Sequence, residues 1–173
     1  MALTKVTGAG VEGLSLSSSS TAISIDANGH VSKPLQPAFC VEKADTDQAN
    51  IAINTNTELV FDLEKYDNNG DFASNTFTAP VDGRYQLNVA IVIRVIDSAA
   101  DYYRIRLSTS NKTFETFVDP DFGQDNAFTQ LGLCVTADMD ANDTAKVHFY
   151  QAGGTAQSDL VYGENYFSGC LVA

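Results

Sequence analysis

The sequence predicts an all-β fold, a two-sheet antiparallel jelly-roll sandwich preceded by an extended N-terminal arm with a small hairpin. From residue 36 onward, short segments of alternating polar and apolar residues follow one another with turn residues between them, and no helical period is present. Residues 72–87 contain one complete unit of strand, turn and strand, in which residues 79–83 supply a proline and a glycine before alternation resumes. A hydrophobic content of 44%, with seven Tyr and ten Phe, supports a packed β-rich body.

The first 36 residues differ in composition from the rest. A glycine-rich start and the serine run 17–20 cannot build a hydrophobic core, so they predict an arm. Residues 22–26 alternate, and Asn28-Gly29 is the preferred pair for a two-residue hairpin turn. We therefore predict two parts, an arm with its hairpin at 1–36, serving as an attachment segment, and a jelly-roll domain at 37–173.

Nine strands are predicted in the body, a number that suits a two-sheet jelly roll. They cover Ala38 to Lys43, Glu58 to Glu64, Asn75 to Thr78, Arg84 to Ile96, Tyr102 to Ser108, Thr113 to Val118, Ala127 to Ala137, Ala145 to Tyr150 and Tyr166 to Val172.

The strand predicted at 84–96 is apolar on both faces. One face should fill the space between the sheets, and it carries Tyr85, Leu87, Val89, Ile91, Ile93 and Val95. The other face begins with polar residues but continues with Ala90, Val92 and Ile96. Because an apolar outer face needs a cover, the pattern predicts oligomerisation.

The charge balance excludes two classes of partner. Twenty-two acidic against ten basic side chains give a net charge of -12, so phosphate backbones and anionic lipid surfaces are repelled. The most apolar run, residues 89–96, is short and contains Arg94, and the N-terminus lacks the apolar core of a secretory leader. We expect neither nucleic-acid binding nor membrane insertion.

Metal and cofactor sites are not expected either. Cys40, Cys134 and Cys170 each lie in an apolar strand-like context and are interpreted as buried thiols, although a disulfide between two of them stays open. His30 and His148 are the only histidines, too few for a zinc site within one chain. Many aspartates lie in predicted loops, where solvation explains them better than calcium because no calcium-loop spacing is present.

Catalytic motifs were not found. The sequence contains no nucleophile elbow, Walker loop or dinucleotide glycine pattern. Asp119 and Asp121 could form a carboxylate pair for sugar hydrolysis, but in so acidic a chain such a pair is weak support for a depolymerase. We expect a protein that is not an enzyme.

Five segments carry a resemblance to a known family. They are Pro37-Ala38-Phe39, Val60-Phe61-Asp62, Asn69-Gly70-Asp71-Phe72, the run from Phe77 to Tyr85, and Phe167-Ser168-Gly169-Cys170-Leu171. In order and spacing the region 37–173 resembles the jelly-roll superfamily of complement globular heads and tumour necrosis factors. That resemblance implies a homotrimer with strand faces around a threefold axis.

The same motifs suggest packing roles for individual residues. Gly83 permits a tight corner and Gly169 gives room where strands approach closely. On the basis of the resemblance, the candidates for core or trimer-axis packing are Phe39, Tyr85, Tyr166 and Phe167.

The segment joining arm and body, residues 21–39, resembles bacteriophage virion proteins that carry such heads. It implies a virion location and a capsid decoration (cement) protein or short head fibre, whose residues 1–36 contact other virion proteins. The alternative is the receptor-binding tip of a tail fibre that recognises a host surface glycan or protein. For that function the candidate exposed loop contacts are Tyr102, Phe122 and Tyr162, which could equally pack between strands or subunits.

Overall fold

The structure, a computed structural model, describes residues 23–173, and the part of the predicted arm at 1–22 lies outside the described residues. The described chain divides between Leu35 and Gln36 into a hairpin and a sandwich. Within residues 23–173 no helix is long and apolar enough to cross a membrane.

The hairpin pairs β1 (Ser24–Ile25) with β2 (Val31–Ser32). Its turn is longer than the predicted two residues, because Asp26 and His30 still pair through the Asp26 N–H and the His30 carbonyl, 3.0 Å apart. The Asp26 carboxylate accepts the backbone N–H of Asn28 and of His30, at 2.8 and 2.9 Å, and so fixes the turn.

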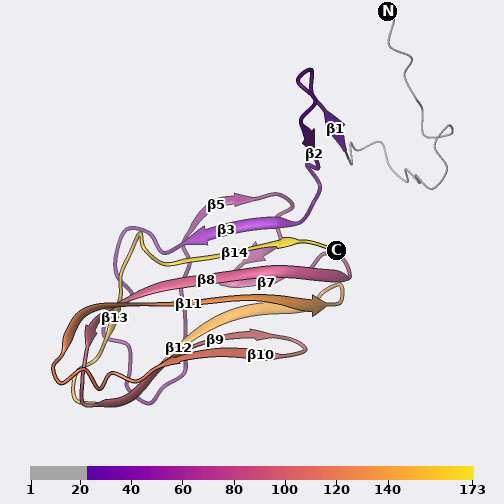
Figure 1. Cartoon of the computed structure of the whole chain (residues 1–173). Helices are drawn as coiled ribbons and strands as arrows, with labels where there is room; N and C mark the ends of the chain where they lie inside the picture. The colour runs from indigo at the N-terminus through magenta and orange to yellow at the C-terminus, as the bar shows by residue number, and fades with distance from the viewer. Residues whose placement is uncertain (1–22) are drawn as a thin grey trace, which may run out of the picture. The chain divides into compact units, whose positions relative to one another are not determined.

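Two sheets form the sandwich and lie face to face (Figure 1). The first sheet has the order β11-β8-β14-β3-β5, with β13 also pairing β8, and the second has the order β10-β9-β12-β7-β6, with β4 also pairing β12. The pairings between named strands are antiparallel, which confirms the predicted fold class. The strands of the first sheet are β3 (Ala38–Glu42), β5 (Leu63–Asp67), β8 (Gly83–Ile96), β11 (Asn126–Met139), β13 (Asp159–Leu160) and β14 (Tyr166–Leu171). Those of the second are β4 (Thr57–Glu58), β6 (Phe72–Ala73), β7 (Thr76–Thr78), β9 (Ala100–Thr109), β10 (Thr113–Val118) and β12 (Thr144–Gly153).

The single strand predicted at 58–64 is wrong. Residues 59–62 leave the ladder between β4 and β5, because the chain crosses there from the second sheet to the first. Side chains supply partners to the crossing backbone: the Val60 N–H donates to Gln48 Oε1 and the Phe61 N–H to Asn75 Oδ1, both at 3.0 Å. The short strands β6 and β13 were not predicted, since two residues show no alternation.

The predicted inner face of β8 is correct as far as Ile93 and wrong at its end. Val95 has a φ of 61°, in the left-handed region that β-branched residues avoid, and its side chain is exposed. The strand alternation therefore shifts by one, and Ile96, predicted on the outer face, is fully buried. Ser158 Oγ donates to the Val95 carbonyl at 2.8 Å and helps to hold this bend.

Candidate oligomer interface

The centre of the outer face of the first sheet is built from uncharged side chains, most of them small. Strand register aligns Cys134, Asn88, Ser168, Cys40 and Tyr66 in one row across β11, β8, β14, β3 and β5. A parallel row on the same face consists of Thr136, Gln86, Cys170 and Ala38. We call the side chains of these two rows, together with Gly132, Ala90 and Tyr166 beside them, the uncharged face.

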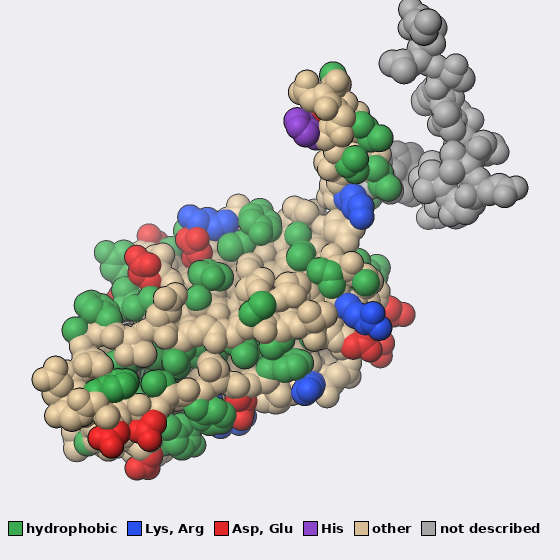
Figure 2. All heavy atoms as spheres, viewed as in Figure 1, with side chains coloured by type: hydrophobic (Ala, Val, Ile, Leu, Met, Phe, Trp, Pro, Cys, Tyr) green, Lys and Arg blue, Asp and Glu red, His purple; other side chains and the backbone are tan. Residues whose placement is uncertain are grey.

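Ionised side chains lie around this face and not within it. Figure 2 shows its centre as hydrophobic and uncharged, with acidic and basic groups toward the rim. One rim pair joins Lys65 Nζ to Glu42 Oε2 at 3.1 Å, and another joins Arg94 Nη2 to Asp159 Oδ2 at 3.1 Å. Depletion of charge at the centre with a polar rim is the composition of a protein–protein interface.

Large aromatic side chains stand on the uncharged face without cover. Tyr66 is 51% exposed and Tyr166 is 40% exposed, whereas Ala90 between the taller side chains is already buried within one chain. Aromatic residues are enriched where interfaces form, because they bury a large area at a small cost in side-chain entropy. The uncharged face therefore has the composition expected of the contact surface for the oligomerisation predicted from β8.

The three cysteines all project from this face. Cys40 and Cys170 are half-buried and all three thiols are free, so no disulfide links them. The prediction of three buried thiols is wrong for Cys134, which is exposed on an outer strand of the sheet, where Gln86 Nε2 donates to its Sγ at 2.9 Å. Burial, with a smaller contribution from Glu42, raises the pKa of the Cys40 thiol.

Three of the four predicted packing residues lie in the core. Phe39 is fully buried, with ring centroids 4.5 Å from Phe77 and 4.9 Å from Phe167. Tyr85 is also fully buried, and its hydroxyl donates to the Val81 carbonyl at 2.8 Å. Tyr166 instead points outward, so among the four it is the one that does not pack in the core.

The two glycines with predicted packing roles, Gly83 and Gly169, lie where a larger side chain has no room. A Cβ on Gly169 would lie 2.7 Å from both Leu87 Cδ2 and Phe39 Cε1. A Cβ on Gly83 would lie 2.5 Å from Leu171 Cδ1 and 2.7 Å from the Ala173 carbonyl oxygen. Gly83 is not among the residues with positive φ, so close packing and not a tight corner explains it.

The three predicted loop aromatics belong to three different parts of the chain. Phe122 and Tyr162 are exposed, in the connections β10–β11 and β13–β14. Tyr102 is not in a loop: it lies in β9 and is half-buried, because it packs against Phe117 and Tyr150.

Acidic side chains in the loops accept hydrogen bonds that stabilise turns. The Asp121 N–H donates to Asp119 Oδ1 at 3.0 Å, an Asx-type turn that any solvated loop can form. No group of three or more His, Cys, Asp or Glu side chains in residues 23–173 is arranged to hold a metal ion.

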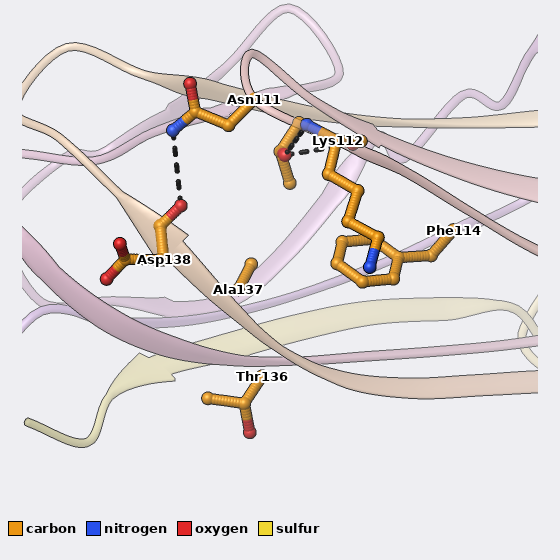
Figure 3. A pocket seen from close by; sticks show the side chains of 7 residues that line it. Asn111, Lys112, Phe114, Thr136, Ala137 and Asp138 are labelled. Carbon is orange, nitrogen blue, oxygen red and sulfur yellow. Dashed lines mark hydrogen bonds between the residues drawn. The ribbon is translucent and has the colours of Figure 1, made fainter.

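A hollow of about 280 Å³ opens between the β9–β10 turn and the end of β11 (Figure 3). Asn111 Nδ2 donates to the Asp138 carbonyl at 3.3 Å, and the Lys112 ammonium lies 4.9 Å from the centroid of the Phe114 ring. Its lining contains no histidine, serine or cysteine, so these residues offer binding groups and no nucleophile beside a histidine base.

The uncharged face could not be read from any single segment. Its members come from five strands, and only their register brings Ser168 of β14 beside Asn88 and Cys40. The available signal was weak: uncharged residues occupy the alternate positions opposite to the core residues only within 166–170 of β14, 38–40 of β3 and 86–92 of β8.

Solved structures share this fold at low sequence identity. The globular domain of zebrafish complement 1qA protein is 19% identical over 80% of this chain and 98% of its own, with a TM-score of 0.58. Murine APRIL is 8% identical, with 79% and 99% coverage and a TM-score of 0.57. Eiger TNF from S. frugiperda is 11% identical, with 80% and 93% coverage and a TM-score of 0.56. No family model and no curated protein matches the sequence. The chain therefore has the jelly-roll fold seen in complement 1q globular domains and TNF-like proteins.

Proposed function

We propose that this protein is a non-enzymatic structural component of a bacteriophage virion, a homotrimer that assembles through the uncharged face. The observation that carries this proposal is that face itself, which crosses five strands without an ionised side chain in its two central rows. A surface of this kind is stable in water when another copy covers it. The resemblance seen in the sequence supports three copies. Three identical subunits form a closed ring when each contacts the next through two unlike surfaces.

Residues 1–36 are proposed to attach the trimer to the particle, as a capsid decoration protein or a short head fibre. Fully extended, 36 residues reach roughly 120 Å, enough to cross neighbouring capsid subunits. Ile25 and Val31 of the hairpin are both exposed, and apolar side chains of this kind favour contact with a partner. Three arms on one trimer would add avidity to a weak individual contact.

The experiment that tests attachment compares the full-length protein with a protein that starts at Gln36. Gln36 is kept because its Nε2 donates to the Leu171 carbonyl at 2.8 Å, within the sandwich. Both proteins are added to purified particles that lack the protein, and to host cells. We expect the full-length protein to bind particles and the shortened one to lose that binding.

A second candidate function is the receptor-binding tip of a tail fibre. It is favoured by Phe122, 44% exposed, and Tyr162, 53% exposed, since exposed aromatic side chains in loops suit recognition. Binding of the shortened protein to host cells, unaffected by loss of the arm, would establish this function in place of particle attachment.

A further inference from the structure

Three aromatic rings lie in contact on the outer face of the second sheet. The Tyr102 ring centroid is 5.6 Å from that of Phe117 and 5.9 Å from that of Tyr150, and the three residues come from the neighbouring strands β9, β10 and β12. Phe117 is 55% exposed. We call these three residues the aromatic platform. It belongs to the sheet opposite the one that carries the uncharged face, so the two surfaces lie on opposite sides of the sandwich.

Hydrogen-bonding groups border the platform. The Arg104 guanidinium carbon lies 4.8 Å from the Tyr150 ring centroid, and Arg104 Nη2 donates to Asn56 Oδ1 at 3.2 Å. The Tyr150 hydroxyl is 3.5 Å from Asn54 Oδ1. Aromatic surfaces with adjoining amide and guanidinium groups match the chemistry of a pyranose, which has an apolar C–H face and a rim of hydroxyl groups.

A cationic group with spare donors lies beside the platform. Glu115 Oε1 accepts from Arg106 Nε at 2.7 Å and also pairs with Arg104 Nη1 at 3.3 Å, so one carboxylate serves two guanidinium groups. Among residues 23–173, the two terminal nitrogens of Arg106 have no hydrogen-bond partner. Arg104 and Arg106 share a strand face two residues apart, about 6.6 Å along the strand, which is on the scale of one sugar ring.

The charge of this face differs from that of the whole chain. Arg104, Arg106 and Lys146 face only Glu58 and Glu115, whereas the protein carries a net charge of -12. The two terminal nitrogens of a guanidinium match a carboxylate in geometry as well as in charge. A long polyphosphate backbone would meet the repulsion of the remaining acidic surface.

We propose that this face binds an acidic saccharide, whose sugar rings stack on the aromatic platform and whose carboxylate is bound by Arg106. The inference goes beyond the proposed structural role, and it does not require the trimer.

The test measures binding of full-length protein to immobilised oligosaccharides. The probes are oligogalacturonates and sialylated oligosaccharides, with uncharged oligomers of glucose and galactose and an oligo-dT strand for comparison. We expect an acidic saccharide to bind in preference to its uncharged counterparts. Phe117→Ala and Arg106→Gln should each weaken it about 10-fold, and Arg106→Gln should also remove the preference for acidic sugars.

A matched control separates this site from other exposed aromatics. Phe128→Ala, at an exposed phenylalanine of β11 in the first sheet, should leave saccharide binding unchanged, and thermal melting of all variants confirms that they fold. The proposal is overturned if no acidic saccharide binds, if oligo-dT binds more tightly, or if binding is unchanged in both Phe117→Ala and Arg106→Gln. Sedimentation of the same samples reports the oligomeric state independently, so saccharide binding by a monomer would refute the trimer and leave this site intact.

Discussion

The two outer faces of the sandwich are built from the same kind of strand yet carry opposite chemistry. On the first sheet the row through Ser168 contains no ionised side chain. On the second sheet the row through Arg106 places it between Glu115 on one side and His148 on the other, with Glu58 beyond. Cross-strand ion pairs are typical of a face that remains solvated. Their absence is typical of a face that is desolvated when a partner covers it. The difference supports the proposal of assembly through the first sheet and of contact with solvent or a polar ligand through the second.

The largest expected effect comes from placing a charge on each face. Ser168→Arg puts a cation at the centre of the uncharged face, where assembly would bury it without a partner. We expect association to weaken at least about 100-fold, measured by sedimentation velocity over a dilution series. Ser108→Arg, the matched change on the second sheet, should leave the sedimentation coefficient unchanged; equal effects of the two would remove the distinction between the faces.

A glycine pair sharpens the comparison between the inner and outer sides of the first sheet. Gly169→Ala forces a methyl group into Leu87 and Phe39 and should reduce the free energy of unfolding by about 2 kcal/mol. Gly132→Ala adds a methyl group on the outer side, where the nearest atom, the Val89 carbonyl oxygen, is 3.6 Å away. Urea unfolding of the dissociated chain, at a concentration below the range of association, should show no loss for Gly132→Ala.

Asp97 ties the two sheets together, because it follows β8 and accepts hydrogen bonds from residues that follow β12. The backbone N–H groups of Thr155, Ala156 and Ala99 lower the pKa of Asp97 to about 2. The folded state therefore binds fewer protons than the unfolded one, and this contribution to stability is present above about pH 4 and lost as the pH falls toward 2.

Asp97→Asn removes the charge from these hydrogen bonds and should lower stability at pH 7 by about 2 kcal/mol, or roughly 4–8 °C in Tm. The loss should shrink in acid. Asp121→Asn, a change at an exposed loop carboxylate, is the control and should shift Tm by less than about 1 °C. A loss for Asp97→Asn that is independent of pH would contradict the role given to the charge.

The smallest effect is expected at His148 on the second sheet. Burial lowers the pKa of His148, and nearby Glu58 opposes that shift. Its contribution to stability is present above about pH 6.5 and is lost as the pH falls through the folded-state pKa. His148→Gln should flatten the dependence of Tm on pH between about 5 and 7, by a degree or two. An unchanged slope of Tm against pH would show that protonation of His148 does not contribute to the pH dependence of stability.

Sequence patterns were sufficient where one period ran through a whole element. The strand predicted at 113–118 matches β10, and the segments 84–96 and 127–137 match β8 and β11 to within two residues. Sequence patterns failed where hydrogen bonds to other segments replace the backbone hydrogen bonds between paired strands. Residues 59–62 alternate like a strand, with Leu59 and Phe61 buried, but side chains of other segments accept the N–H groups of Val60 and Phe61.

Surface chemistry was harder to predict than the core because it depends on register. Alternation placed Tyr85 on the inner face and the family resemblance gave Phe167 as a packing candidate, but neither indicated that Cys134 is exposed beside Gln86. A run of apolar residues does not indicate that Val95 has a positive φ. The sequence therefore could not predict that Val95 is exposed and Ile96 is buried. The residues of the aromatic platform are distant in sequence, and only the pairing of β9 with β10 and β12 joins them.

The central claim is that the uncharged face is covered by other copies of the chain, and its three thiols report on it directly. Cys134 is exposed within one chain, so in a free monomer it would react readily with iodoacetamide. Peptide mass mapping, which distinguishes Cys134 from Cys40 and Cys170, measures that reaction in the native full-length protein and in the protein in urea. We predict strong protection of Cys134 at micromolar concentration, lost in Ser168→Arg. Labelling of native Cys134 as fast as in urea would contradict the assembly.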